Sequence, residues 1–540
     1  MSSLLPLLAV LLPAVAIPLI YVSGSRPNLR EAWTMLAALA TFGVVAVMVR
    51  SGETYVTPLG SLAGFELGLR ADSAGLLFAL LASTLWIATS LYSIGYMRGL
   101  AEHDQTRYFA AFAASIAATM GVALASDLLT LFVFYELLTL ATYPLVAHSG
   151  DEKARAAGRK YLGYTLGGGV LALGGILLVQ AGASSLAFVP GGIAALGLAD
   201  PTLGRLAFAL LVAGFGVKAA VVPFHAWLPA AMVAPTPVSG LLHAVAVVKS
   251  GAFAVTRSVL YVFGPETAEA LGMALPLAIF AAATMVLAGI VGIRQDNLKR
   301  GLAFSTISQL SYIVLGVALL TPVAAFGALL HVVAHAFMKI TLFFAAGLIY
   351  VETGEKYVSD LAGVGRRLPL TMTAFAVAAA GLIGFPLVAG FVSKFHLLIG
   401  AAESASPIFV GAFLVAGLLK LLYFWPIVYV TIFGEAGGDS PASRHAFAPV
   451  HGVTDGGLTA HETAVSDDSE TAVDEGDADP AGDADSVVFA PTTHRWGLEA
   501  SPFVLGPILF TVGMAVLLGV VPTALPFWDL ASAAVTEVFG

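Results

Sequence analysis

The 540-residue chain contains no cysteine and few charged residues. Without thiols it forms no disulfide, no thiolate metal site and no cysteine-held iron–sulfur cluster, so we expect any redox centre to belong to a partner. Charged residues make up 11% of the chain, hydrophobic residues 58%, and the mean hydropathy is +0.91; an ordinary soluble domain carries about 25% charged residues. The sequence has no Walker A motif and no G-x-G-x-x-G opening a βαβ unit, which disfavours nucleotide hydrolysis and NADH binding in this chain.

Long apolar segments recur along the whole sequence. A helix of about 20 apolar residues crosses roughly 30 Å of hydrocarbon, so we predict an all-α membrane protein with about fourteen transmembrane helices. The segments are 3–21, 31–50, 72–97, 106–125, 127–148, 160–182, 203–222, 238–263, 272–293, 300–320, 323–350, 369–400, 406–434 and 502–523. We expect the first to be retained rather than cleaved as a signal, because no Lys or Arg precedes it and no A-x-A site follows.

The basic residues of the connecting loops predict the orientation. If the N-terminus is outside, the inside loops carry sixteen Lys and Arg, and the outside loops carry Arg50, Arg70 and Arg205. Arg257, near the end of the eighth segment, is ambiguous. This asymmetry fits the positive-inside rule and predicts a multi-pass protein of the cell membrane with its N-terminus outside.

One stretch does not belong to the membrane. Residues 435–489 contain thirteen Asp and Glu against a single Arg, Arg444. Such composition is typical of a disordered, solvated segment, and we predict an acidic cytoplasmic insertion over 435–500. An adaptation to a salty cytoplasm is the simplest explanation, and a cation-collecting surface is the alternative.

Titratable side chains lie within the apolar segments, where a charge costs roughly 2.5–3.5 kcal/mol even on a lenient insertion scale. Folding alone does not require this load, and buried lysines and carboxylates can change protonation near neutral pH, so the pattern predicts a path for protons or cations. The residues are Glu136, Lys218, His243, Lys249, His331, His335, Lys339, Lys394 and Lys420.

Two of the segments contain a proline near a lysine. Pro223 follows Lys218 by five residues in the seventh segment, and Pro386 precedes Lys394 by eight in the twelfth. Proline interrupts a helix, and paired interrupted helices at matching positions point to inverted repeats with ion sites at the breaks. We therefore predict broken helices 7 and 12 in two related halves, spans 4–8 and 9–13.

The remaining candidates are weighed by their spacing. His331, His335 and Lys339 fall at i, i+4 and i+8 on one helix face, an arrangement that suits a proton relay because imidazole accepts and donates protons near neutral pH. No H-E-x-x-H glutamate or thiolate accompanies the two histidines, so we predict no metal and no cofactor. Glu136 is either one half of a static ion pair or the group that tunes Lys218, and Lys420 either snorkels or serves packing.

Four stretches carry a resemblance to a known family: GVKAAVVPFHAWLPAAMVAPTPVSGLLHA, QDNLKRGLAFSTISQLSYIVLG, HVVAHAFMKITLFFAAG and GFPLVAGFVSKFHLL. In content and order they resemble the antiporter-like subunits shared by respiratory complex I and Mrp-type cation/proton antiporters, over roughly residues 70–435. The resemblance implies fourteen helices with two inverted five-helix repeats and discontinuous helices 7 and 12.

The resemblance also implies roles. Glu136 looks like the family's glutamate of helix 5 and Lys218 like its lysine of helix 7, while His243 and Lys249 fall at ionisable positions of helix 8. His331 and His335 match the helix 11 histidines and Lys394 the terminal ionisable residue of helix 12. Because only about 17 residues follow the last span, the chain most resembles the D-type subunit of Mrp antiporters, from a salt-adapted organism.

From this resemblance we expect a proton-translocating subunit of a sodium/proton antiporter that is not itself an enzyme. Its partners would be other membrane subunits, protons, Na⁺ and lipid, and not nucleic acid. The expected regions are a three-helix N-terminal part (1–105), a first repeat (106–264), a second, inverted repeat (265–434), the insertion (435–500) and a last helix with its tail (501–540). A subunit of a redox-driven complex I-like or hydrogenase-type pump, a bicarbonate-uptake subunit and a non-conducting scaffold remain open.

Overall fold

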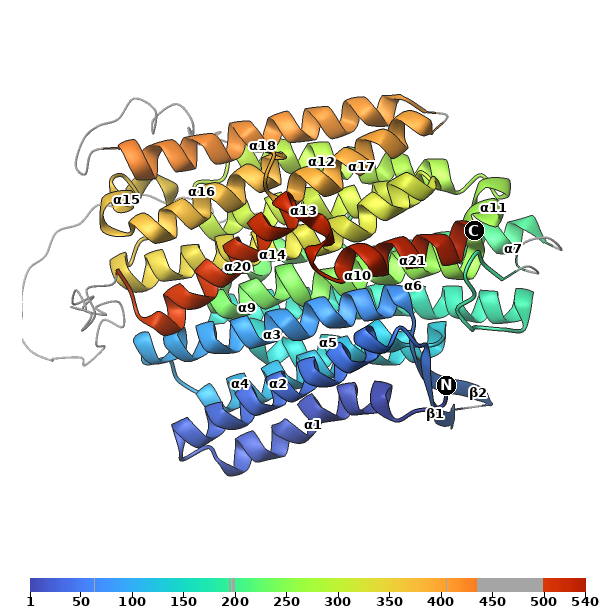
Figure 1. Cartoon of the computed structure of the whole chain (residues 1–540), viewed down its shortest axis with the longest axis horizontal. Coiled ribbons are helices and arrows are strands. Elements are labelled where there is room, and N and C mark those ends of the chain that lie inside the picture. Colours follow the sequence, from blue (N-terminus) through green and yellow to red (C-terminus); the bar gives the residue numbers. More distant parts are fainter. Residues whose placement is uncertain (63, 194–195, 197–199, 405, 435–498) are drawn as a thin grey trace, which may run out of the picture.

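Long helices that run side by side form almost the entire molecule (Figure 1). The computed structural model describes the chain except for residues 63, 194–195, 197–199, 405 and 435–498. The predicted acidic insertion therefore lies outside the described residues, apart from its last two. Both termini lie at the same end of the bundle (Figure 1).

The first part of the chain contains α1 (Leu5–Val22), α2 (Pro27–Ser51), α3 (Ser73–Gly99), α4 (Gln105–Leu124), α5 (Leu128–Val146), α6 (Glu152–Ala183) and α7 (Pro201–Lys218). After α8 (Trp227–Ala230) and the 3₁₀ turn η1 (Ala231–Val233), one long helix follows. It consists of α9 (Thr236–Gly240), the π-helical η2 (Leu241–Val245), α10 (Val247–Arg257), the π-helical η3 (Ser258–Phe263) and α11 (Gly264–Ala270).

The second part contains α12 (Ala274–Ile293), α13 (Leu298–Ala318), α14 (Pro322–Thr353), η4 (Val358–Asp360), α15 (Val364–Arg367), α16 (Pro369–Ile383), α17 (Ala389–Glu403), α18 (Ile408–Phe433), α20 (Pro502–Val520), η5 (Pro522–Ala524) and α21 (Phe527–Phe539). Thirteen helices of the described chain are long and apolar enough to cross a membrane. The fourteenth predicted segment, 369–400, consists of α16 and α17, and each of these is only 15 residues long.

The chain is interrupted near both prolines. The α7 helix ends at Lys218 and α8 begins at Trp227, so Pro223 lies in the non-helical stretch between them. In the same way, Pro386 lies between the end of α16 and the start of α17. A helix end leaves backbone carbonyls without an intrahelical donor, and the two breaks place such carbonyls inside the bundle.

A hairpin between α2 and α3 was not predicted from the sequence. Strands β1 (Tyr55–Leu62) and β2 (Phe65–Ala71) pair antiparallel, with an irregularity between Pro58 and Gly60. The hairpin also contacts the chain elsewhere, through a bridge between Leu69 and Ala125. It lies at the end of the bundle that holds both termini (Figure 1).

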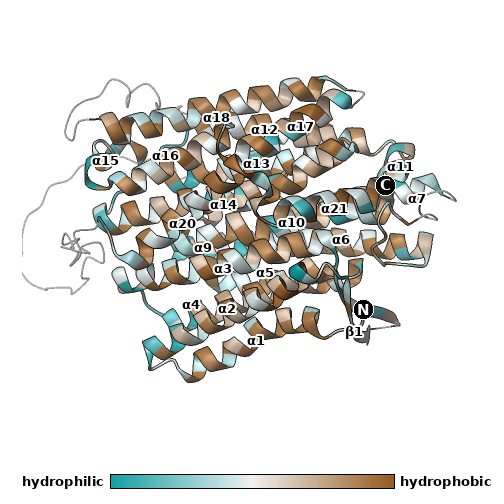
Figure 2. Cartoon of the chain, in the orientation of Figure 1, coloured by the Kyte–Doolittle hydropathy of each residue, from teal (hydrophilic) through white to brown (hydrophobic). Residues whose placement is uncertain are grey.

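Hydropathy differs between the sides and the ends of the helices. Apolar residues cover most of the helix length and hydrophilic residues gather toward the helix ends (Figure 2). Leu140, Val170 and Phe280 are examples of large apolar side chains that remain exposed on the outside of the bundle. Exposed apolar surface of this extent suits a lipid environment and not water.

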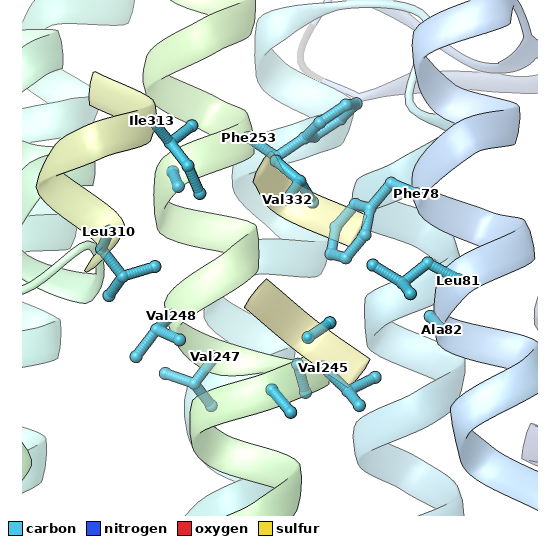
Figure 3. Packing of buried hydrophobic residues seen from close by; sticks show 14 of the residues in the cluster. Phe78, Leu81, Ala82, Val245, Val247, Val248, Phe253, Leu310, Ile313 and Val332 are labelled. Atoms are coloured by element: carbon cyan, nitrogen blue, oxygen red, sulfur yellow. The ribbon is translucent and has the colours of Figure 1, made fainter. Parts of the chain in front are cut away.

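The centre of the bundle is packed by apolar side chains from different helices. Phe78 of α3 and Phe253 of α10 meet with ring centroids 5.1 Å apart. Val332 of α14, and Leu310 and Ile313 of α13, lie in the same region (Figure 3). This packing surrounds the helices that carry the candidate polar residues and excludes water from most of their length.

Candidate functional site: a row of buried ionisable groups

Lys218 occupies the C-terminal end of α7 and is fully buried. Its ammonium donates to the backbone carbonyl of Tyr135 in α5 and lies 3.3 Å from the centroid of the Tyr135 ring. The carbonyl of Val217, freed by the end of the helix, accepts a hydrogen bond of 2.8 Å from the indole Nε1 of Trp227. A cation is favourable at a helix C-terminus because the aligned peptide dipoles place negative charge there.

Glu136 is half-buried beside this lysine without bonding to it. Neither carboxylate oxygen has a hydrogen-bond partner among the described residues, and no ion pair joins Glu136 to Lys218. Gly169 of α6 makes room for the carboxylate, since a Cβ at Gly169 would lie 2.5 Å from Oε1 of Glu136. The static ion pair considered from the sequence is therefore not present in this structure.

Lys249 joins the first cluster to the second half of the protein. Gly251, two residues further along α10, packs on the end of α7, where a Cβ would lie 2.6 Å from the carbonyl carbon of Lys218. The buried Lys249 Nζ lies 2.6 Å from Nδ1 of His335 in α14. The described structure contains no direct bond between Lys218 and Lys249, so a gap separates them.

The two histidines of α14 lie in sequence behind Lys249. The His335 and His331 rings are 6.1 Å apart between centroids and nearly parallel. His331 uses both ring nitrogens, because Nε2 lies 2.8 Å from Oε1 of Gln309 and Nδ1 lies 2.9 Å from Oγ of Ser393. An amide oxygen only accepts, so Nε2 of His331 carries the proton and Nδ1 accepts from Ser393.

The break after α16 continues this series. Gln309 Nε2 donates to the carbonyl of Leu382 at 3.3 Å, and the ammonium of Lys394 donates to the same carbonyl. Lys394 also donates to the carbonyl of Ile383 at 3.3 Å. Both carbonyls belong to the last two residues of α16, so the interruption supplies backbone acceptors between His331 and Lys394.

Two predicted residues lie beside this series and not within it. Lys339 donates to Oγ of Ser305 at 3.0 Å and to the carbonyl of Leu302 at 3.4 Å. His243, in the π-helical segment η2, packs against the Phe343 ring at 4.8 Å, and neither of its ring nitrogens has a hydrogen-bond partner in the described chain. The charged groups nearest His243 in effect are Lys339 and Lys299.

We call Glu136, Lys218, Lys249, His335, His331, Gln309 and Lys394 the buried row. The structure brings its members together from several helices and adds Gln309 and Ser393, which the sequence analysis did not single out. Lys420 of α18 is also buried and acts electrostatically on Lys339 and Lys394, so it neither snorkels nor stands apart. A run of buried polar residues in α13, from Ser305 to Ser311, was the available signal for Gln309.

A buried ion pair far from the row was also missed. Arg257 of α10 is fully buried, and its Nη2 lies 2.5 Å from Oδ1 of Asp72. Three aromatic rings, those of Phe188, Phe253 and Tyr261, lie within 5.1 Å of the guanidinium carbon. Asp72 also caps α3 through the N–H of Gly75, so the pair locks the long helix that carries Lys249 against the start of α3.

A cavity opens at the end of the bundle opposite the termini. This basin has a volume of about 790 Å³. Loops predicted to lie on the inside of the membrane meet there, and the lining includes Glu102, His148, Lys153, Lys299 and Lys356. Lys299 donates to the carbonyl of Ala234, which lies just before the helix of His243 and Lys249. Basic and acidic groups thus line a wet approach toward the middle of the protein.

The chemistry of the row suits proton exchange. Lysine, histidine and glutamate each hold or release one proton, and the amide of Gln309 and the freed carbonyls provide hydrogen-bond partners between them. Titratable groups inside a transmembrane bundle mark ion or proton pathways. Fold and site together define a multi-pass membrane protein of the ion-translocating class.

The family follows from comparison. Residues 125–420 match the family model described as NADH:quinone oxidoreductase/Mrp antiporter, TM, and the chain belongs to this family. The matched region contains every residue of the buried row. The chain is therefore an antiporter-like membrane subunit of the type found in Mrp and complex I-like complexes, and other membrane subunits are its partners.

Individual relatives come from both kinds of complex. The chain is 36% identical to NADH-quinone oxidoreductase subunit N of Desulforudis audaxviator, over 79% of this chain and 86% of the relative. It is 33% identical to the A/B-type subunit of a probable K⁺/H⁺ antiporter from Rhizobium meliloti, over 71% of this chain and 38% of that longer protein. A chain in the structure of the Mrp complex from Dietzia sp. DQ12-45-1b has the same fold, with a TM-score of 0.80, 22% identity, and 99% and 97% of the two chains covered.

Proposed function

We propose that this chain conducts protons in a multisubunit Mrp-type monovalent cation/proton antiporter, as that antiporter's D-type component, and that it is not an enzyme by itself. The observation that carries the proposal is the continuous series Lys249–His335–His331–Gln309–Leu382 carbonyl–Lys394. A static scaffold has no need of so many buried titratable groups in contact with one another.

In the proposed mechanism a proton exchanges at Lys218, with Glu136 holding the compensating charge. It then crosses the gap to Lys249, where no described side chain bridges the two ammonium groups, and a water molecule completes the link. From Lys249 it passes through His335 and His331 to Lys394. His243 and Lys339 adjust the charge around the series from the side, and Na⁺ is the cation exchanged.

The test uses everted membrane vesicles that contain the chain with its partner subunits. A pH gradient is imposed artificially, without any electron donor, and its collapse is followed after NaCl addition. We expect collapse in the wild type and its loss in Lys218→Ala or Lys249→Met, at equal amounts of assembled complex. The control is Arg155→Ala, an exposed basic residue of α6 outside the row, which should transport normally.

A redox-driven complex I-like pump is the second candidate, and a specific observation favours it. The relative matched over the larger share of its length is an NADH-quinone oxidoreductase subunit. In that case the same row would carry protons, while electron transfer in partner subunits would drive them. No collapse from a fully assembled complex, together with proton pumping after an electron donor is added, would replace the antiporter proposal with this one.

A further inference from the structure

Two histidines and a glutamate meet at the edge of the basin, away from the buried row. Glu102 and His103 lie in the loop between α3 and α4, and His148 lies in the turn after α5. One ligand atom from each residue lies within 4.8 Å of the others. Neither loop takes part in the mechanism proposed above.

His148 is the anchor of this cluster. Its side chain is only 1% exposed, and neither ring nitrogen has a hydrogen-bond partner among the described residues. The ring is fixed between that of His103, at 5.0 Å and nearly parallel, and that of Tyr108, at 5.6 Å and edge-on. A neutral imidazole has one lone pair and one N–H, so both are left unused in a buried place unless a ligand takes the lone pair.

The tautomer of His103 leaves a second lone pair in the same place. Nε2 of His103 lies 3.2 Å from the carbonyl oxygen of His148. A carbonyl oxygen only accepts, so Nε2 carries the proton and Nδ1 presents its lone pair. Nδ1 lies 3.8 Å from Oε2 of Glu102, and two lone pairs that face each other at this distance repel unless a cation or a proton lies between them.

The charges around the cluster permit a cation. Burial raises the pKa of Glu102, while His103 and Lys299 lower it. Burial and the nearby His103 and Arg107 hold the pKa of His148 at about 4, so this imidazole is neutral at physiological pH. Arg107 opposes a cation, but Asp104 pairs with it at 3.1 Å.

We propose that Glu102, His103 and His148 bind a late divalent transition metal ion, represented by Zn²⁺. Two imidazole nitrogens and one carboxylate oxygen form a His₂Glu set that zinc accepts, whereas Mg²⁺ and Ca²⁺ require oxygen ligands. Three protein ligands leave the fourth position to water from the basin. Ligand atoms around tetrahedral zinc lie about 3.3 Å apart, and rotation of the more exposed Glu102 and His103 side chains closes the difference.

A bound ion would join two loops that are distant in the sequence. The α3–α4 loop and the turn after α5 would be tied together at the rim of the basin. We therefore expect the metal to reduce the mobility of both loops and to raise the thermal stability of the purified complex. This inference does not depend on whether the driving partner is an antiporter or a redox module.

The experiment titrates the purified, chelator-treated complex with ZnCl₂ and follows binding by calorimetry, with Co²⁺ as a spectroscopic probe of ligand geometry. We expect one ion per chain at this site and tetrahedral-type Co²⁺ absorption. His103→Ala and Glu102→Gln should each weaken binding at least as strongly as loss of an outer hydrogen-bond partner does, roughly 10–100-fold. Both side chains are partly exposed, so these variants should fold.

Two matched controls separate the site from surface binding. Glu355→Gln changes another carboxylate at the basin, and His396→Ala changes a histidine in α17 that packs against Phe326 and Trp528. Both should bind Zn²⁺ as the wild type does. Equal affinity in the wild type and His103→Ala, or equal losses in the controls, would mean an adventitious ion only and would overturn the proposal.

Discussion

Replacing Gln309 with leucine should slow proton transfer through the second half of the buried row. Gln309 is fully buried and is the one side chain that connects His331 to the Leu382 carbonyl in the described structure. Leucine has nearly the same size but no polar atoms. The variant therefore leaves the packing in place and removes the acceptor for Nε2–H of His331.

The magnitude follows from the cost of a buried donor without a partner. That cost is about 1–3 kcal/mol. If it must be met when the proton leaves His331 toward Lys394, each 1.36 kcal/mol slows the rate tenfold, and transport falls by about 5- to 150-fold. Gln309→Glu keeps an acceptor next to His331 and should retain more activity than Gln309→Leu.

The assay is the initial rate of gradient collapse in everted vesicles, normalised to assembled complex, or the donor-driven pumping rate if the complex is redox-driven. Ser311→Ala is the matched control. Ser311 is buried in the same helix, but its hydroxyl bonds only to the carbonyl of Ile307, within its own helix. A Gln309→Leu rate within twofold of the wild type, or an equal loss in Ser311→Ala, would refute the reasoning.

Three further predictions concern other parts of the structure. Gly169→Ala should displace the Glu136 carboxylate and reduce transport, whereas Gly167→Ala, whose Cβ would meet no atom within 4 Å, should leave the transport assay unchanged. Arg257→Met leaves Asp72 without its buried partner and should lower the free energy of unfolding by about 3–5 kcal/mol; adding Asp72→Asn should recover part of this in thermal unfolding, and full additivity would contradict the coupling. Asp151 caps α6 by accepting from the N–H of Ala154 at 2.6 Å, which lowers the pKa of Asp151. Asp151→Ala should therefore cost about 0.5–2 kcal/mol and Asp151→Asn very little. Because the folded pKa lies below the unfolded one, the charge-dependent part is complete above the unfolded pKa and is lost as pH falls through the folded value. A Tm difference between wild type and Asp151→Asn that does not shift toward the variant in acid would contradict this sign.

The helical membrane fold could be predicted from the sequence because bilayer thickness sets the length of an apolar helix. Even the irregular twelfth segment was recognisable, since Pro386 interrupts a run that is otherwise long enough to span. The β-hairpin at 55–71 was missed because Pro58 and its glycines are typical of a loop. Its pairing depends on contacts with the chain near Ala125, which no local pattern reveals.

The candidate site was predicted in membership more than in arrangement. A titratable group in an apolar segment is conspicuous, so all eight proposed residues were found without coordinates. Helical spacing placed His331 and His335 on one face, but it did not show that Lys249 contacts His335 and His243 does not. Gln309 escaped because an amide carries no charge, and the surroundings of Lys420 because its neighbours come from other helices. Whether these residues carry protons stays a prediction.

The metal cluster illustrates a different limit. Glu102 and His103 are adjacent in the sequence, but His148 is 45 positions away and reaches them only through the fold. Spacing rules for metal motifs apply to ligands on one local element. A site assembled from two loops therefore leaves no recognisable spacing, and the sequence analysis predicted no metal.

The acceptors for the two lysines at the helix breaks are peptide groups. Lys218 bonds to the carbonyl of Tyr135, and Lys394 to those of Leu382 and Ile383. Every amino acid supplies the same carbonyl, so alanine scanning leaves these acceptors in place and undercounts the groups that hold a charge in the membrane. Evolution can exchange the side chains at 135, 382 and 383 freely in this respect, provided that the chain keeps its course. What inheritance must preserve there is a backbone shape, and ester substitution of single peptide bonds is the kind of perturbation that can reach it.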